Sequence, residues 1–135
     1  DRYERPIWQN APGVNNQFSK GTSRQMPDIS AVAYNLAVYF QGQWGAVGGT
    51  SAAAPIWAAG LALMNEGLLQ QVGKFIASPD LFYIVADNAN GMHPYYDVTR
   101  GNNLYYPAAS GWDYASGLGT PNLGDFYKVL SSKLA

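Results

Sequence analysis

The first part of the chain lacks a regular hydrophobic pattern, and strand-like patterns follow it. Residues 1–27 are polar and hold prolines and glycines among asparagine and glutamine, which is typical of a long loop. The apolar run 29–34 predicts a buried strand. Two further apolar runs, 36–40 and 44–47, are separated by residues 41–43, and this short polar spacing predicts a β-hairpin.

A helix is expected directly after the hairpin, where Gly48 and Gly49 end the second strand. It is predicted to begin near Thr50 and Ser51 and to run to about Asn65, because the segment is rich in alanine, a strong helix former. The segment has almost no polar face, which predicts a helix buried on all sides. Its apolar run is well short of the ~20 residues that a membrane span needs, so we expect no membrane partner.

The second half of the chain combines two amphipathic helices with a long irregular region. The spacing of apolar residues predicts a short helix over 79–85. Residues 87–121 are rich in Gly, Asn, Tyr and Pro, and a loop of this length commonly has a function such as ion binding. Asn122 is expected to cap a final helix with an apolar face.

The composition supports a folded core and excludes several classes of function. Hydrophobic residues make up 47% of the chain and charged residues only 13%, which excludes a disordered tail and leaves little ionic surface. We therefore expect part of the chain to pack against something else. The net charge of −1, without a basic stripe, argues against a nucleic-acid partner. The absence of cysteine excludes disulfides, zinc-thiolate sites and a cysteine nucleophile.

The strongest chemical signal is the segment that joins the hairpin to the apolar helix. Gly48 to Pro55 reads Gly-Gly-Thr-Ser-Ala-Ala-Ala-Pro, which places Ser51 at a helix N-terminus after a glycine turn. Free backbone N–H groups and the helix dipole favour negative charge there, and an acyl-transfer intermediate develops such charge on its oxyanion. The alternative is that Ser51 serves only as a helix cap.

This segment resembles the nucleophile motif of two related peptidase families. Gly-Thr-Ser-x-x-x-Pro opens a buried helix both in subtilisin-like peptidases and in the sedolisin family, which includes the kumamolisins. Subtilisin-like enzymes typically have His after the proline, whereas this chain has Ile56, which favours the sedolisin family. The resemblance implies an α/β fold with a subtilisin-like parallel sheet flanked by helices. It implies Ser51 as the nucleophile, with Gly49 and Thr50 forming the oxyanion and nucleophile turn.

A second constellation lies in the long irregular region. Asp97-Val98-Thr-x-Gly-x-Asn is followed by Gly111-Trp-Asp113 and a Gly-Leu-Gly-x-Pro segment, and two aspartates in glycine-rich loops offer the oxygen ligands that calcium prefers. The spacing does not match an EF-hand. It resembles the C-terminal calcium site of sedolisins, which implies one Ca²⁺ held by the carboxylates of Asp97 and Asp113 and the carbonyls of Val98, Ala109 and Gly111. Ala109 stands where related proteins have Gly, which could constrain the loop. The alternative is a pair of solvated surface aspartates.

The catalytic partners that the resemblance calls for do not occur in this sequence. Sedolisins pair a Glu with an Asp, and a further Asp completes the oxyanion hole, all well upstream of the serine. Asp28 is expected to have a structural role in a turn instead. We therefore interpret residues 1–135 as the C-terminal portion of a sedolisin-like catalytic domain, inactive on its own, because a serine without a base is a weak nucleophile.

The resemblance also implies what the complete protein does and where it acts. It implies a secreted serine-type endopeptidase of acidic pH optimum that forms an acyl-enzyme on protein or peptide substrates. The expected partners are the remainder of the catalytic domain and a propeptide. Two alternatives stay open: a non-enzymatic calcium-stabilised module descended from a peptidase, and a subtilisin-like peptidase with an upstream histidine.

Overall fold

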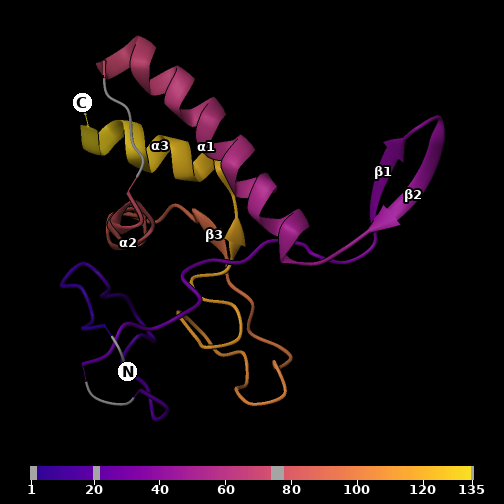
Figure 1. Ribbon diagram of the computed structural model, residues 1–135. Coiled ribbons are helices and arrows are strands. Elements are labelled where there is room, and N and C mark those ends of the chain that lie inside the picture. Colours follow the sequence, from indigo (N-terminus) through magenta and orange to yellow (C-terminus); the bar gives the residue numbers. More distant parts are fainter. Residues whose placement is uncertain (1–2, 20–21, 74–77, 135) are drawn as a thin grey trace.

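Three helices, two small antiparallel sheets and long loops make up the part of the chain that the structure describes (Figure 1). The computed structural model describes residues 3–19, 22–73 and 78–134. The elements in chain order are β1 (Leu36–Phe40), β2 (Gln43–Val47), α1 (Thr50–Val72), α2 (Asp80–Asp87), β3 (Tyr95–Tyr96), β4 (Thr120–Pro121) and α3 (Leu123–Leu134). The predicted hairpin, the two amphipathic helices and the long irregular region are thus confirmed.

The three helices meet around one aromatic core. α3 lies beside α1, and α2 packs against α3 (Figure 1). Trp57 of α1 lies at the centre, in edge-on contact with Phe82 of α2 and Phe126 of α3 at centroid distances of 5.2 and 5.8 Å. Its indole nitrogen also donates a 2.8 Å hydrogen bond to the carbonyl of Ser30. Trp57 therefore fixes the first half of α1 to both neighbouring helices and to the segment that leads into the hairpin.

Helix α1 is longer and much less buried than its sequence predicts. It runs on past Asn65 as far as Val72 and ends at Gly73, which adopts the left-handed conformation. Leu63 and Leu69 are 68% and 52% exposed, because only the helical core and the residue 29–31 segment cover the helix within the described residues. The expectation of a helix buried on all sides is therefore wrong for this chain.

The length and composition of α1 would also suit a membrane span. Within Thr50–Gln71, an 18-residue window has a mean hydropathy of 1.2, and 28% of that window is buried. One such helix is weak evidence of a span, because a core helix of a soluble protein has the same properties.

The predicted parallel sheet is absent from the described ranges 3–19, 22–73 and 78–134. β1 pairs with β2, and β3 with β4, and both pairings are antiparallel. Residues 29–34, predicted as a buried strand, are irregular. A strand needs a hydrogen-bonding neighbour, and the 29–31 stretch instead borders an apolar depression of about 420 Å³ against α1. The observed fold is mixed α/β with small antiparallel sheets.

A buried polar network ties the N-terminal loop to α2. The hydroxyl of Tyr83 donates a 2.6 Å hydrogen bond to Asp28, and the amide of Gln9 donates to the same hydroxyl at 2.9 Å. Arg24 forms a 2.6 Å salt bridge with the other carboxylate oxygen of Asp28. Asp28 thus has the structural role expected from the sequence. Burial, followed by the hydrogen bond to Asp28, raises the pKa of Tyr83 well above its usual range.

Replacing Tyr83 with phenylalanine is expected to lower the free energy of unfolding by about 1.5–3 kcal/mol at neutral pH, because a hydrogen bond to a charged group is lost. The raised pKa means that the folded state holds the phenolic proton more tightly than the unfolded state. The contribution of the Tyr83 hydroxyl to the free energy of unfolding is complete below about pH 10 and is lost as pH rises further. Urea unfolding between pH 7 and 11 measures both effects.

The control for this experiment is Tyr105→Phe, since the Tyr105 side chain is 83% exposed. It should change neither the stability nor its pH dependence. An unchanged free energy of unfolding in Tyr83→Phe would contradict the structural role given to this network.

Candidate functional site

Ser51 lies in the first turn of α1, and it is not the cap of this helix. The cap position belongs to Gly49, which has φ 107° and ψ 170° and no side chain to satisfy the first amides. This conformation is open essentially only to glycine. The Gly49 N–H donates to the carbonyl of Ala33 at 2.7 Å, while its carbonyl accepts from Ala52 at 2.9 Å. The glycine thus anchors the turn that presents Ser51.

The N-terminal turn leaves polar groups available around the Ser51 hydroxyl. Thr50 and Ser51 are both exposed. Within the described part of the chain, their backbone amides donate no hydrogen bond. The positive end of the helix dipole lies at the same turn. Pro55 has no N–H, so it cannot donate to the carbonyl of Ser51 as a residue four positions on normally would. The turn can therefore stabilise an oxyanion beside an accessible hydroxyl.

An apolar depression begins directly at Ser51. Its volume is about 430 Å³, and it separates the hairpin from the first turns of α1. Its walls are aliphatic and come from both elements: Leu36, Val38, Val47, Pro55 and Ile56. The sequence motifs do not connect these hairpin residues with the serine. The alternation of Leu36, Val38 and Phe40 on one strand face was the signal that could have done so.

No acid–base partner for Ser51 is present in the described chain. The hydroxyl of Ser51 forms no hydrogen bond within the described residues, and none of the residues lining its depression is titratable. Glu66 follows on the same helix but lies roughly 22 Å along its axis, at 1.5 Å per residue. That the base comes from outside this chain stays a prediction.

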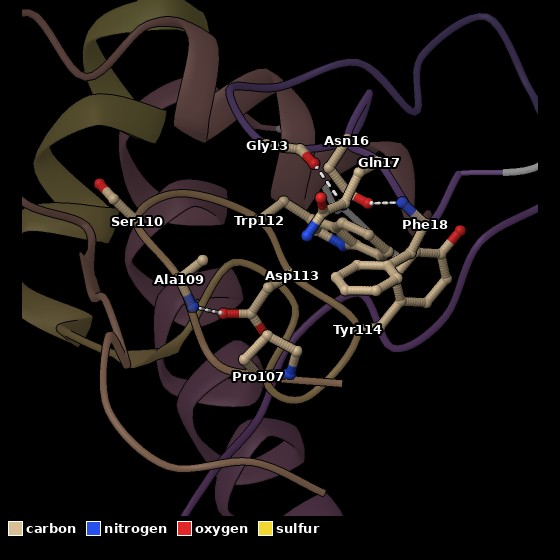
Figure 2. A pocket seen from close by; sticks show the side chains of 10 residues that line it. All are labelled: Gly13, Asn16, Gln17, Phe18, Pro107, Ala109, Ser110, Trp112, Asp113 and Tyr114. Atoms are coloured by element: carbon tan, nitrogen blue, oxygen red, sulfur yellow. Dashed lines mark hydrogen bonds between the residues drawn. The ribbon is translucent and has the colours of Figure 1, made fainter. Parts of the chain in front are cut away.

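The two aspartates of the second constellation converge on one short segment. Asp97 accepts a 2.8 Å hydrogen bond from the amide of Gly111, and Asp113 accepts one of 2.7 Å from the amide of Ala109. Figure 2 shows the Asp113 side chain directed at Ala109 from inside the loop. Asp113 is 4% exposed, and its other oxygen accepts from Ala115 and Ser116. Asp97 is exposed.

The oxygen atoms around this segment suit a hard cation. Within the described residues, the carbonyls of Val98, Ala109 and Gly111 accept no hydrogen bond, and neither aspartate forms a salt bridge. Calcium takes six to eight such oxygens, and these groups with water molecules would provide them. No group of three or more His, Cys, Asp or Glu side chains gathers anywhere among the described residues. The donor set therefore fits calcium and does not fit a zinc site.

The backbone conformation of this loop requires glycine at position 111 and permits alanine at position 109. Gly111 has φ 77°, and a Cβ there would lie 2.5 Å from the carbonyl oxygen of Pro12. Ala109 is not among the described residues with positive φ, so its alanine side chain imposes no backbone strain. The concern that Ala109 constrains the loop is thus not supported by its backbone conformation.

A cavity of about 310 Å³ lies behind the loop and is lined largely by apolar and aromatic groups (Figure 2). Tyr106 stacks on Tyr114 at 4.7 Å, Trp112 meets Tyr114 edge-on at 4.8 Å, and Phe18 meets Tyr106 at 5.3 Å. These rings attach the loop to the N-terminal segment. They hold the 109–113 stretch, and with it both aspartates, in place.

Comparisons with known proteins agree on one relationship. No protein-family model matches the chain. Tripeptidyl-peptidase 1 of Dictyostelium discoideum is 34% identical over 131 residues, covering 90% of this chain and 21% of the relative. Kumamolisin of Bacillus sp. (strain MN-32) is 34% identical over 128 residues, covering 86% of this chain and 22% of the relative. This chain thus spans about a fifth of the length of these relatives.

The structural comparison gives the same result. The structure of Pseudomonas sedolisin, a serine-carboxyl proteinase complexed with two molecules of pseudo-iodotyrostatin, matches with a TM-score of 0.79 and 27% identity. The match covers 99% of this chain and 36% of that chain. By sequence and by structure, the chain belongs to the family of sedolisins, kumamolisins and tripeptidyl-peptidases.

Proposed function

We propose that the natural protein containing this chain is a serine-carboxyl endopeptidase whose nucleophile is Ser51. The observation that carries this proposal is the exposed Ser51 hydroxyl in an uncapped helix turn with two unused amides. The relationship to sedolisin and kumamolisin supports it. The 135 residues alone are not expected to cleave peptides, because no base lies near Ser51 within the described residues.

The reaction is an acyl transfer. The Ser51 Oγ attacks the peptide carbonyl carbon while a carboxylate from another segment of the protein accepts its proton. The carbonyl electron pair moves to oxygen, and the Ser51 and Thr50 amides are positioned to stabilise this oxyanion. The C–N bond then breaks, the carboxylic acid returns the proton to the leaving amine, and an acyl-Ser51 ester forms. Water hydrolyses this ester by the reverse proton transfers.

We also propose one calcium ion at the 97–113 constellation. Asp97 and Asp113 would provide carboxylate oxygens, and Val98, Ala109 and Gly111 would provide carbonyl oxygens. The unused carbonyls and the absence of a countercharge among the described residues support this assignment. When bound, the ion would neutralise the two carboxylates and link β3 to the loop before β4, so its contribution is to stability.

The rest of the protein is proposed to complete the fold. A parallel sheet from other segments would cover the 420 Å³ depression beside residues 29–31 and the exposed side of α1. A propeptide partner, secretion and the absence of nucleic-acid and membrane partners are proposed on the same relationship. The low charged fraction of 13% and the exposed apolar residues of α1 support a large apolar contact with other segments.

The pH dependence of peptide hydrolysis tests the proposed mechanism. We expect kcat/KM of the natural protein to rise about tenfold per pH unit up to about pH 4 and to be substantial at pH 4–5, because a carboxylate base must lose its proton. A rise centred near pH 6.5 would indicate a histidine base and a subtilisin-like peptidase instead. Peptides left intact at every pH would favour the non-enzymatic module.

A further inference from the structure

The β1–β2 hairpin has two faces of different character, and one of them is directed at Ser51. Cross-strand partners share a face, so Leu36 with Val47, Val38 with Gly45, and Phe40 with Gln43 form one face. The Ala37–Ala46 and Tyr39–Trp44 pairs form the other. Figure 1 shows the hairpin projecting from the body of the molecule beside the first turn of α1. The first face lines the depression at Ser51 with Leu36, Val38 and Val47, and the other face contributes only Ala37 to that lining.

This face carries a continuous groove from Ser51 towards the hairpin tip. The depression of about 430 Å³ at Ser51 and a second of about 450 Å³ along the hairpin share Val38 and Val47 in their walls. Gly45 lies in the wall of the second depression, opposite Val38, so no side chain rises between them. Phe40 and Gln43 close its outer part. Gln41 and Trp44 also line this outer depression. The groove is therefore apolar near Ser51 and more polar towards the hairpin tip.

The contents of the groove follow from its position. A peptide whose carbonyl carbon is within bonding reach of the Ser51 Oγ must place neighbouring residues within a few ångströms of Val47 and Val38, since each extended residue spans about 3.3 Å. Apolar pockets of this kind favour an aliphatic or aromatic side chain of matching size. Both outer edges of the hairpin are unpaired within the described residues, so an extended chain also finds backbone hydrogen-bonding groups there.

We propose that Val38, Val47 and Gly45 form a specificity-determining subsite that accepts an apolar side chain of the peptide substrate near the bond attacked by Ser51. This inference rests on the proposed peptidase function and deepens it. Gly45 is the key position, because the absence of its side chain leaves the groove open. The helix N-terminus provides the Ser51 hydroxyl, whereas the hairpin selects which peptide sequences bind next to it.

The structure offers a clean test at Gly45. A Cβ at this position would approach only the carbonyl oxygen of Val38, at an ordinary 4.0 Å, so the backbone has room for the first side-chain atom in Gly45→Val. The matched control is Ala46→Leu, which adds the same number of carbon atoms to the opposite face. Both variants are made in the natural protein. They are assayed with peptide sets in which each position around the cleaved bond is Leu, Phe or Ala in turn.

At one substrate position, Gly45→Val is expected to lower the kcat/KM ratio of Leu or Phe over Ala by about tenfold or more, as loss of an apolar pocket does. Ala46→Leu should leave every ratio unchanged. Should Gly45→Val fail to fold, Val38→Ala, at a side chain already 39% exposed, widens the same groove and should raise the ratio for Phe.

Hydrolysis with unchanged preferences in Gly45→Val would overturn the inference while leaving the proposed function intact. An equal loss for all peptides, together with a lower melting temperature, would overturn it as well, because the rest of the protein would then cover this face. A natural protein that hydrolyses no peptide would overturn the proposed function itself, and the subsite with it.

Discussion

Replacing Ser51 with alanine is expected to lower kcat for peptide hydrolysis by the natural protein at least about 10,000-fold. The physical reason is that the Ser51 Oγ is the atom that forms the bond to the carbonyl carbon in the proposed mechanism. The amides that stabilise the oxyanion remain, so residual hydrolysis above the uncatalysed rate can persist. Substrate affinity should change little, because alanine keeps the shape of the turn. Single-turnover and steady-state kinetics at pH 4–5 measure both quantities.

A serine on the far side of the helical core provides the control. Ser131 lies on α3, where its hydroxyl donates a 3.1 Å hydrogen bond to the carbonyl of Lys128. Ser131→Ala should retain full activity. If Ser51→Ala kept a kcat within tenfold of the unaltered protein, the nucleophile would have to be another residue.

Calcium is expected to raise the free energy of unfolding of the natural protein by about 2.7 kcal/mol at a concentration 100 times its dissociation constant. Asp97→Asn should remove most of this increase, because it takes one negative charge from the proposed ligand set. Asp97 is exposed, and its hydrogen-bond partner within the described residues is the Gly111 amide, so the variant should fold. Thermal unfolding with added calcium and with a chelator gives the comparison.

Asp87 at the end of α2 is the matched control, since it is an exposed aspartate outside the loop. Asp87→Asn should keep the full calcium-dependent increase. Asp113→Ala should lose the calcium effect and should also be less stable without calcium, because it removes the acceptor for buried amides. Identical melting temperatures with calcium and with chelator in the unaltered protein would remove the ion from the proposal.

Elements whose formation depends on nearby residues were predicted well from the sequence. The hairpin bounds follow from two short apolar runs around Gln41 and Gly42, which both have positive φ in the turn. The final helix follows from Asn122 and a regular apolar spacing, and its buried residues Phe126 and Leu130 lie on the predicted face. Local propensity and periodicity suffice in these cases.

Predictions that require a partner segment elsewhere in the fold were wrong, because the described chain contains no such partner. Residues 29–34 have the composition of a buried strand, but no neighbouring strand is present in the described chain to pair with them. For the same reason α1 shows an exposed apolar side in place of complete burial. The composition of a segment indicates that it is suited to burial. Its observed secondary structure and exposure depend on which neighbouring segments are present.

The candidate sites were predicted in part. The motif places Ser51 in the first helical turn, and the structure shows that Gly49, and not the serine, occupies the cap position. The aspartates, 16 positions apart, meet at the 109–111 segment, although spacing alone does not bring them together. The groove at Val38 and Val47 could not be predicted without the strand register, because the register fixes the face on which each side chain lies. The roles of all these residues in catalysis and calcium binding stay predictions.

Covalent labelling can show whether the Ser51 hydroxyl is the group that attacks the peptide carbonyl. The natural protein is incubated at pH 4–5 with a peptidyl electrophile that reacts with activated serine, and the modified residue is located by peptide-mapping mass spectrometry. We predict one stoichiometric adduct on Ser51, and the fraction of labelled protein should equal the fraction of activity lost at each time. Complete inactivation with the adduct on another residue, while Ser51 stays unmodified, would contradict it.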